Sequence, residues 1–398
     1  MTAREDCKSR PGELPTMKKM LTALLLAATS TAALAATPAV PSPPKIAANG
    51  YILMDHDSGR VLAAQRADER MEPASITKLM STYLVFAALQ EKRLALTDTV
   101  KVSEHAWRTG GAVTDGSTSF LELGSEVPVD ALIQGMIVQS GNDATIVLAE
   151  KLGGTEDGFV QIMNEYAKRL GLTGTHFMNS WGKPDPNHYS TARDIAMLAN
   201  ALIRDFPEYY KYYSQREFTW NKHRQFNRNG LLGRDPSVDG LKTGHTESAK
   251  YCLVTSAKRD GMRLVSVVLG ADSVKAREDA SATLLNYGYT FFETVKLQDA
   301  GAVVLKPTVY KGAATTVDIG SRKSIAVTVA RGSADQITKE AVVNSPLVAP
   351  IEAGQVVGEY KVSVGDEVVG RTPLVALSKV DEGGIWRWAV DSVKLWFE

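Results

Sequence analysis

The chain changes its residue pattern near residue 297, and this change restricts the possible folds more than any other feature. Before it, apolar residues recur at helical spacing over 76–89, 129–139, 144–152, 159–170, 191–203 and 275–292. Strand-like runs lie towards the two ends of the same region, at 51–54, 250–255 and 264–269. Helices in the middle and strands at both ends predict an α/β domain over 45–296 that is built on an antiparallel sheet.

The region after residue 297 consists of short β-branched runs separated by Gly, Pro and Asp. In one of them Tyr360, Val362 and Val364 alternate with Lys361 and Ser363, which is the period of a half-buried strand. The full set of runs is 302–305, 314–319, 324–330, 355–364 and 374–377. Several short strands at such spacing predict a β-rich second domain over 297–380, a small β-sandwich.

The start of the chain has the pattern of an export signal. Met17 and two lysines precede an apolar run that ends in small residues at 33–35. This pattern predicts a signal peptide region over 1–35, with the signal proper from 17. An uncleaved anchor is the alternative, but the run of about 15 residues is shorter than the roughly 20 that span a bilayer. Cleavage would leave Cys252 as the only cysteine, in an apolar run where we expect a buried, unreactive thiol.

The end of the chain predicts an amphipathic helix within 383–398. One face carries Trp386, Ala389, Val393, Trp396 and Phe397, and the opposite face carries Arg387, Asp391, Lys394 and Glu398. Such a helix either packs on its own domain or lies in a lipid headgroup layer. Half of the six Trp of the chain lie in this terminal stretch, which favours association with a membrane surface.

Three short motifs follow one another along the first domain. They are Ser-Ile-Thr-Lys at 75–78, Ser-Gly-Asn at 140–142 and Lys-Thr-Gly at 242–244. Each is weak alone, since a second Ser-x-x-Lys occurs at 180–183, in a Gly- and Pro-containing loop. Ser75 instead opens an apolar helical run, so Lys78 falls on the same face one turn later. Together, at separations of about 65 and 100 residues, they match the motif set of class A β-lactamases and penicillin-binding proteins.

The motifs supply the groups for acyl transfer without histidine. The Ser75 hydroxyl is a poor nucleophile until a neighbour removes its proton, and the neutral amine of Lys78 is suited to do so. Burial and a second cation, for which Lys242 is the candidate, would lower the pKa of Lys78. We expect Ser140 to relay the proton to the leaving amine and Asn142 to hold Lys78 and a substrate amide. Backbone N–H groups near Ser75 suit an oxyanion hole.

The Lys-Thr-Gly motif precedes an apolar strand-like run, and we expect it on an edge strand that faces the cleft. There Gly244 permits the close approach of a peptide backbone, which can pair as an added strand. Lys242, Thr243 and His245 offer donors for a free C-terminal carboxylate.

These residues carry a resemblance to a known family. The chain reads Pro-Ala-Ser-Ile-Thr-Lys from 73, Gln-Ser-Gly-Asn-Asp-Ala from 139, Asn-Arg-Asn-Gly from 227 and Val-Asp-Gly-Leu-Lys-Thr-Gly-His-Thr from 238. It resembles the low-molecular-mass D-alanyl-D-alanine carboxypeptidases, the group of penicillin-binding proteins five and six, over nearly the whole mature chain. The β-rich second domain and the terminal helix are similar too. At 181–184 the chain reads Trp-Gly-Lys-Pro, where family members often have His-Gly-Leu-Asp.

The resemblance implies an activity and a location. Ser75 would be acylated by peptidoglycan stem peptides, with release of the terminal D-alanine, and by β-lactam antibiotics as inhibitors. Lys78 would be the base, Lys242, Thr243 and His245 would bind the terminal D-alanine, and Arg228 would help to order the carboxylate site. The protein would be periplasmic and attached peripherally to the inner membrane. The departure at 181–184 would affect substrate contacts at the rim of the active-site cleft and the rate at which the acyl-enzyme is hydrolysed.

Other functions are weighed against this one. A class A β-lactamase would carry a Glu-x-x-Leu-Asn segment between 142 and 242, and none occurs. A DD-endopeptidase and a sacculus-binding protein with an idle site remain open. The 45 basic residues balance 45 acidic ones, so no excess of positive charge suggests nucleic acid. The six His are scattered and no cofactor motif occurs, so we expect no metal and no cofactor.

Overall fold

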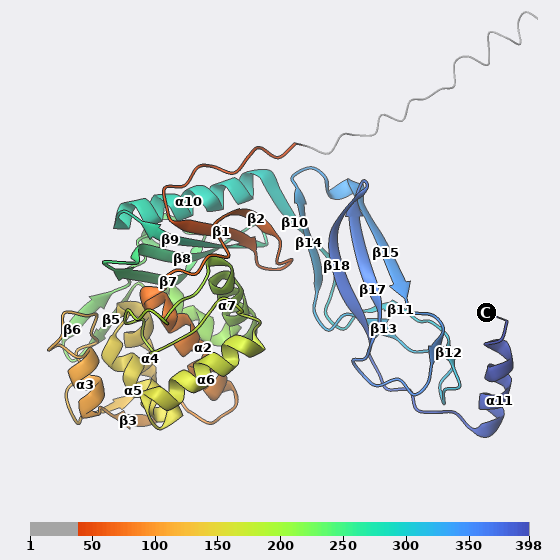
Figure 1. Ribbon diagram of the computed structural model, residues 1–398, viewed down its shortest axis with the longest axis horizontal. Coiled ribbons are helices and arrows are strands. Elements are labelled where there is room, and N and C mark those ends of the chain that lie inside the picture. The colour runs from red at the N-terminus through yellow and green to blue at the C-terminus, as the bar shows by residue number, and fades with distance from the viewer. Residues whose placement is uncertain (1–38, 398) are drawn as a thin grey trace, which may run out of the picture. The chain divides into compact units, whose positions relative to one another are not determined.

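The structure is a computed structural model that describes residues 39–397 (Figure 1). The expected signal peptide at 1–35 lies outside the described residues. The first domain contains a five-stranded antiparallel sheet in the order β2-β1-β9-β8-β7. Its strands are β1 (Gly50–Asp55), β2 (Val61–Gln65), β7 (Val238–Thr246), β8 (Lys250–Arg259) and β9 (Met262–Ala271). The expected antiparallel sheet is therefore present, and β7 with its Lys-Thr-Gly motif forms one edge.

The central strands are buried on both faces because alternate residues enter two separate cores. In β9, Val265 and Val267 belong to the core shared with most of the helices. Leu264 and Val268 point the other way, into the core shared with the long helix α10 (Val274–Phe291). The period of two that defines a strand thus divides one apolar run between two layers of helices.

Helices fill the middle of this domain, as the sequence predicts. The main ones are α2 (Lys78–Gln90), α4 (Val129–Gln134), α5 (Asn142–Gly153), α6 (Glu156–Arg169) and α7 (Ala192–Asp205). Short elements complete the domain: α3 (Glu104–Gly110), α8 (Pro207–Tyr210), α9 (Leu231–Arg234), and the 3-10 helices Ala74–Thr77 and Lys211–Ser214. Two further antiparallel strand pairs are β3 (Thr99–Lys101) with β4 (Glu126–Pro128), and β5 (Glu217–Trp220) with β6 (His223–Phe226). Thr155, Thr191 and Ser273 cap their helices by accepting the N–H three residues further on.

One expected helix is divided where it approaches the second motif. The segment expected as one helix over 129–139 forms α4 and then a π-helical turn, Gly135–Gln139. Ser140 follows in the left-handed conformation with φ of 66°, and Asn142 starts α5. The wide turn and the left-handed residue interrupt regular hydrogen bonding at the point where Ser-Gly-Asn must face the cleft.

The second domain is rich in β-structure, as expected. A five-stranded sheet runs in the order β11-β13-β18-β17-β15, and β10 pairs with β14 in a second sheet. Side chains of both sheets, such as Val327 and Val362, share one apolar core. The strands are β10 (Phe292–Gln298), β11 (Val303–Leu305), β12 (Val309–Tyr310), β13 (Ile319–Gly320), β14 (Ile325–Ala330), β15 (Ile337–Val343), β16 (Leu347–Val348), β17 (Val356–Val364) and β18 (Glu367–Ala376), with a 3-10 turn at Ala334–Gln336.

Two details of this domain differ from the sequence expectation. The strand expected at 314–319 was wrong for most of its length, since β13 contains only its last residue and Gly320. Strand β15 was not predicted; its Thr338, Lys339 and Glu340 are exposed at the edge of the sheet. An edge strand with little buried surface lacks the alternation of apolar residues by which strands are found.

The last helix, α11 (Ile385–Lys394), turns its polar side toward the domain that precedes it. Asp391 is 5% exposed and accepts a 2.8 Å hydrogen bond from the backbone N–H of Lys311. Trp386 and Trp396 are 88% and 89% exposed. The expected amphipathic helix is present, and its aromatic stripe does not pack on the described domain. No described helix is both long and apolar enough to cross a membrane.

The buried helical core predicts a clear difference between two leucines. Leu132 in α4 is 0% exposed and Leu123 is 52% exposed. Leu132→Ala should lower the free energy of unfolding by about 2–5 kcal/mol, because it removes contacts and leaves a cavity. Leu123→Ala should change it by less than about 0.5 kcal/mol. Urea denaturation followed by circular dichroism measures both, and equal effects would contradict the packing described here.

Candidate active site

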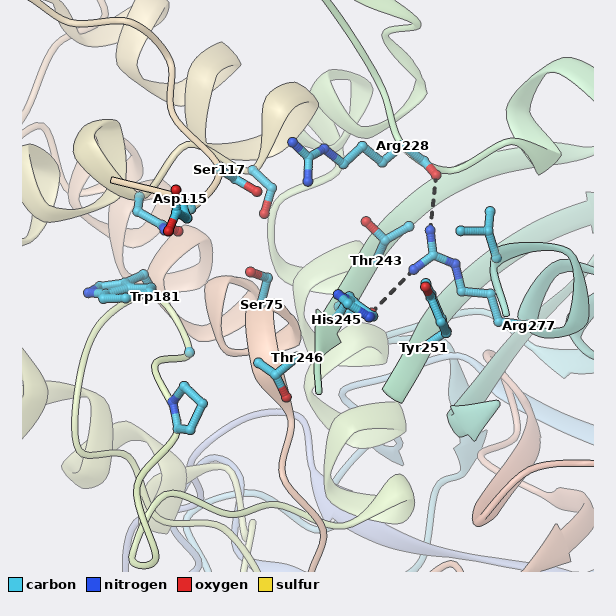
Figure 2. Close-up of a pocket in the computed structure, with 17 residues that line it drawn as sticks. Ser75, Asp115, Ser117, Trp181, Arg228, Thr243, His245, Thr246, Tyr251 and Arg277 are labelled. Carbon is cyan, nitrogen blue, oxygen red and sulfur yellow. Dashed lines mark hydrogen bonds between the residues drawn. The ribbon is translucent and has the colours of Figure 1, made fainter. Parts of the chain in front are cut away.

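Ser75 lies on a tight turn that presents it to a cavity. It belongs to the 3-10 helix Ala74–Thr77, which leads directly into α2. Ala74 has a φ of 48°, and the Thr77 hydroxyl donates to the Ala74 carbonyl over 2.8 Å. Ser75 lines a cavity of about 560 Å³ together with Ser140, Asn142, Arg228, Thr243, Gly244 and His245 (Figure 2). The fold therefore brings the three motifs to one cavity.

Lys78 is fully buried directly behind Ser75. Its Nζ lies 3.1 Å from Ser75 Oγ, 2.8 Å from Asn142 Oδ1 and 2.8 Å from the Trp181 carbonyl. A neutral amine has two N–H donors and one lone pair, which match two acceptors and one hydroxyl. Burial is the main cause that holds the pKa of Lys78 well below its ordinary value, and the positive charge of Arg228 lowers it further. The lowered pKa favours the neutral amine, whose lone pair can then accept the proton of Ser75.

Lys242 lies close to the same centre although it does not line the cavity. Its Nζ is buried and donates to the Thr243 carbonyl over 3.0 Å. Burial lowers the pKa of Lys242 well below its usual value, and Lys78 and Arg228 add to this effect. The role expected for Lys242, to lower the pKa of Lys78, stays a prediction. The charge of Arg228 is the leading electrostatic cause for Lys78, and Lys78 and Lys242 are close enough for their charges to interact.

Ser140 and Asn142 are held in place by a buried carboxylate. Asp143 accepts hydrogen bonds from the N–H groups of Ser119 and Leu121 and from the Thr118 hydroxyl. These bonds fix the loop before β4 against the start of α5. The Ser140 hydroxyl is buried and has no hydrogen-bond partner among the described residues. It therefore remains available for a group that enters the cavity.

The far end of the cavity is cationic. Arg277, from α10, lines it beside Thr243 and His245 and donates to the carbonyls of Gly244 and Arg228 (Figure 2). The ring of His245 packs on Tyr251, with 4.2 Å between the ring centroids. Arg277 was not predicted from the sequence, since it lies among charged residues of an amphipathic helix, where a solvent-exposed side chain is the usual case. Its burial became visible only in the fold.

The loop that carries Trp181 is locked against the Ser75 turn. Gly182 has a φ of 96°, and a Cβ at this position would lie 1.9 Å from the Ala74 carbonyl oxygen. Asn179 Oδ1 accepts from the N–H groups of Gly182 and Lys183. This contact holds the Trp181 carbonyl on Lys78. The departure from the usual motif at 181–184 thus leaves its main-chain contact with Lys78 in place.

His188 gives the same loop a second attachment. Its Nε2 lies 2.8 Å from Thr77 Oγ1, and its Nδ1 accepts the N–H of Met178. The Thr77 hydroxyl already donates to Ala74, so His188 Nε2 is the donor in this bond. Burial lowers the pKa of His188 to about 4, so the ring stays neutral near pH 7. The second Ser-x-x-Lys does not form a serine–lysine pair, as expected: the Ser180 hydroxyl donates to Glu156 and Lys183 is exposed. Cys252 is buried, as expected, and burial raises the pKa of its thiol to about 11.

A buried amine beside a serine hydroxyl, next to an edge strand and a cationic pocket, defines a serine acyl-transfer enzyme of the penicillin-binding type. Comparison with known proteins agrees. Residues 36–273 match the family model of D-alanyl-D-alanine carboxypeptidase, and residues 292–382 match that of the penicillin-binding protein 5 C-terminal domain. The chain belongs to the D-alanyl-D-alanine carboxypeptidase family, and it is a serine-type carboxypeptidase of that family.

Individual relatives cover nearly the whole chain. It is 42% identical to D-alanyl-D-alanine carboxypeptidase DacA of Escherichia coli over 361 residues, which are 90% of each protein. Penicillin-binding protein 5 of Haemophilus influenzae is similar in structure, with a TM-score of 0.79 and 41% identity over 86% of this chain and 100% of that one. Penicillin-binding protein 6B of Escherichia coli gives a TM-score of 0.70 with 36% identity over 85% and 98%.

The locked loop yields a test by mutation. Gly182→Ala should push the loop away from Ala74 and move the Trp181 carbonyl off Lys78, which should lower the rate of acylation by penicillin at least about tenfold. Gly154→Ala is the matched control, because Gly154 also has a positive φ but nothing within 4 Å of the added methyl group. Stopped-flow measurement of acylation separates the two. Equal rates in both variants would rule out a role for the contact.

The charge of Arg228 predicts a change in pH dependence. The active form of Lys78 is the neutral amine, so acylation should rise with pH through the pKa of Lys78 and then level off. Removing a nearby positive charge raises that pKa, so Arg228→Gln should move the acidic limb of the profile to higher pH. Arg216→Gln, an exposed control, should leave the limb in place. The position of the limb is the readout, and a limb that stays fixed in Arg228→Gln would contradict the assignment.

Proposed function

We propose that Ser75 attacks the carbonyl between the last two D-alanines of a peptidoglycan stem peptide. Neutral Lys78 takes the hydroxyl proton over the 3.1 Å contact, and the backbone N–H of Ser75 stabilises the oxyanion. The leaving D-alanine amine receives a proton through Ser140 Oγ, whose hydrogen-bonding capacity is otherwise unused. Lys78 then deprotonates the water that hydrolyses the ester and frees Ser75. The Ser75–Lys78 pair is the single observation that carries this proposal.

The substrate carboxylate would bind at the cationic end of the cavity. Thr243 and His245 line it on the edge strand, and Arg277 and Arg228 supply positive charge. The peptide would add to β7 as a further strand, because β7 lies at the edge of its sheet. Gly244 has no side chain and so allows β7 to pack closely on the turn at 73–76. β-Lactams would acylate the same serine. In domain terms, we propose that 45–296 form the catalytic domain, 297–380 the β-rich domain and 383–398 the terminal helix.

The two Ser-x-x-Lys sequences provide a direct test with an internal control. Ser75→Ala should abolish labelling by a fluorescent penicillin and release of D-alanine from pentapeptide, because Ser75 Oγ is the hydroxyl that contacts the buried amine of Lys78. Ser180→Ala should keep the label, since the Ser180 hydroxyl is bonded to Glu156. Labelling that persists in Ser75→Ala would refute the proposal. Measuring the cleavage of crosslinked peptide dimers alongside D-alanine release from pentapeptide detects any endopeptidase activity.

We also propose that the protein is exported, that it is periplasmic, and that α11 attaches it to the surface of the inner membrane. The exposed side chains Ile385, Trp386, Val393, Trp396 and Phe397 support this, because few water-soluble surfaces expose so many large apolar groups together. Lys311 and Asp391 hold the polar side of the helix toward its own domain. The exposed side is thereby left free to enter a headgroup layer.

Vesicle sedimentation tests the attachment. Deleting 385–398, or replacing Trp386 and Trp396 by Ser, should release most of the protein from phosphatidylcholine vesicles, because aromatic burial drives the binding. Lys394→Gln should have a small effect on binding to neutral vesicles and serves as the control. Unchanged partition of the double Trp variant would contradict the proposal.

A further inference from the structure

The loop whose carbonyl contacts Lys78 is also held by a carboxylate that the acyl-transfer chemistry described above does not use. Ser180, the residue before Trp181, is 0% exposed. Its N–H and its hydroxyl both donate to Glu156 Oε1, over 3.0 and 2.7 Å. Its carbonyl accepts a hydrogen bond from the Ser81 hydroxyl, on α2. Ser180 is therefore fixed from α6 on one side and from α2 on the other.

Glu156 is itself held in place by its neighbours. It is the first residue of α6, where Thr155 caps the helix by accepting the N–H of Gly158. A negative charge is favourable at this end of a helix. The Glu156 side chain is 12% exposed, and its Oε2 lies 3.0 Å from Nε2 of His105, on α3. The two carboxylate oxygens thus have separate partners, Ser180 on Oε1 and His105 on Oε2, and these partners fix where the carboxylate points.

The charge of Glu156 acts on the amine of Lys78 as well. Burial and the positive charge of Arg228 lower the pKa of Lys78, whereas the negative charges of Asp143 and Glu156 raise it. Lys242, on β7, is a further cation whose charge interacts with that of Lys78. Glu156 therefore offers a contact to the loop and a charge to the amine. Substitution by glutamine separates the two, because an amide keeps an acceptor oxygen and loses the charge.

We propose that Glu156 is a positioning residue for acylation, which fixes Ser180 so that the Trp181 carbonyl stays on Lys78 Nζ, and whose charge opposes that of Arg228 at the base. This inference rests on the proposed role of Lys78 as the base. Without the carboxylate, Ser180 has two buried donors that lack their acceptor, and movement of the loop relieves that cost. A loop that moves takes the carbonyl away from the amine, whose lone pair then loses its fixed direction toward Ser75.

Two substitutions test the contact and the charge separately. Glu156→Gln keeps the acceptor for Ser180, so acylation by a fluorescent penicillin should reach the plateau rate of the unmodified protein. Loss of the negative charge lowers the pKa of Lys78, so the acidic limb of the pH profile should move to lower pH, by on the order of half a unit. Glu156→Ala removes the contact too, and its plateau rate should fall at least about tenfold. Stopped-flow measurement across the limb and the plateau gives both quantities.

Glu165→Gln is the matched control, because Glu165 lies on the same helix with its side chain 63% exposed and its change removes the same charge. Its limb and its plateau should both match those of the unmodified protein. The shift in Glu156→Gln should also persist when His105→Gln is present, because the charge of Glu156 causes it and titration of the imidazole does not. Circular dichroism checks that Glu156→Ala is folded.

An unchanged plateau in folded Glu156→Ala would overturn the inference, and so would a limb in Glu156→Gln that coincides with that of Glu165→Gln or shifts only when His105 is present. If Glu156→Ala does not fold, the limb of Glu156→Gln decides. A limb that moves in Arg228→Gln and stays fixed in Glu156→Gln overturns the role of Glu156 alone. A limb that moves in neither variant, or penicillin labelling that persists in Ser75→Ala, overturns the proposed function as well.

Discussion

The site depends on one buried amine. A lysine ammonium removed from water without a counter-ion is destabilised by several kcal/mol, so the folded chain favours the neutral form of Lys78. Around that neutral amine, Asn142 and the Trp181 carbonyl take the two N–H groups, and the lone pair is left for the hydroxyl of Ser75. Burial thus produces the base and also directs it to one hydroxyl.

Such a base is useful only if its neighbours cannot move. The structure achieves this with main-chain contacts: the turn at Ala74 packs against Gly182 at a distance that excludes a side chain. His188 ties the same loop to Thr77, and Asp143 ties the Ser-Gly-Asn segment to the loop at 118–121. Three separate stretches of sequence therefore converge because each is closely packed on, or hydrogen-bonded to, a neighbouring stretch. Positioning of this kind supplies much of the rate enhancement in acyl transfer.

Sequence patterns predict the groups of this site better than they predict its framework. Ser75, Lys78 and the Lys-Thr-Gly strand could be found because residue type and spacing define their chemistry. The Trp181 carbonyl could not, since any residue supplies a carbonyl and only the fold decides which one meets Lys78. Arg277 was missed for a related reason, because burial of one charged residue on an amphipathic helix depends on what packs above it. The fold class followed from periodicity, whereas the π-helical turn before Ser140 has no pattern of its own.

The terminal helix α11 buries its polar side and exposes its apolar side. In water an amphipathic helix normally packs its apolar side and exposes its polar side. Here Asp391 is buried on Lys311, while Trp386 and Trp396 face outward. Aromatic side chains of this size bury some 150–250 Å² each when covered. An arrangement that leaves such an area uncovered in water gains free energy when an apolar phase covers the exposed side, and this is the physical basis of the attachment proposed for α11.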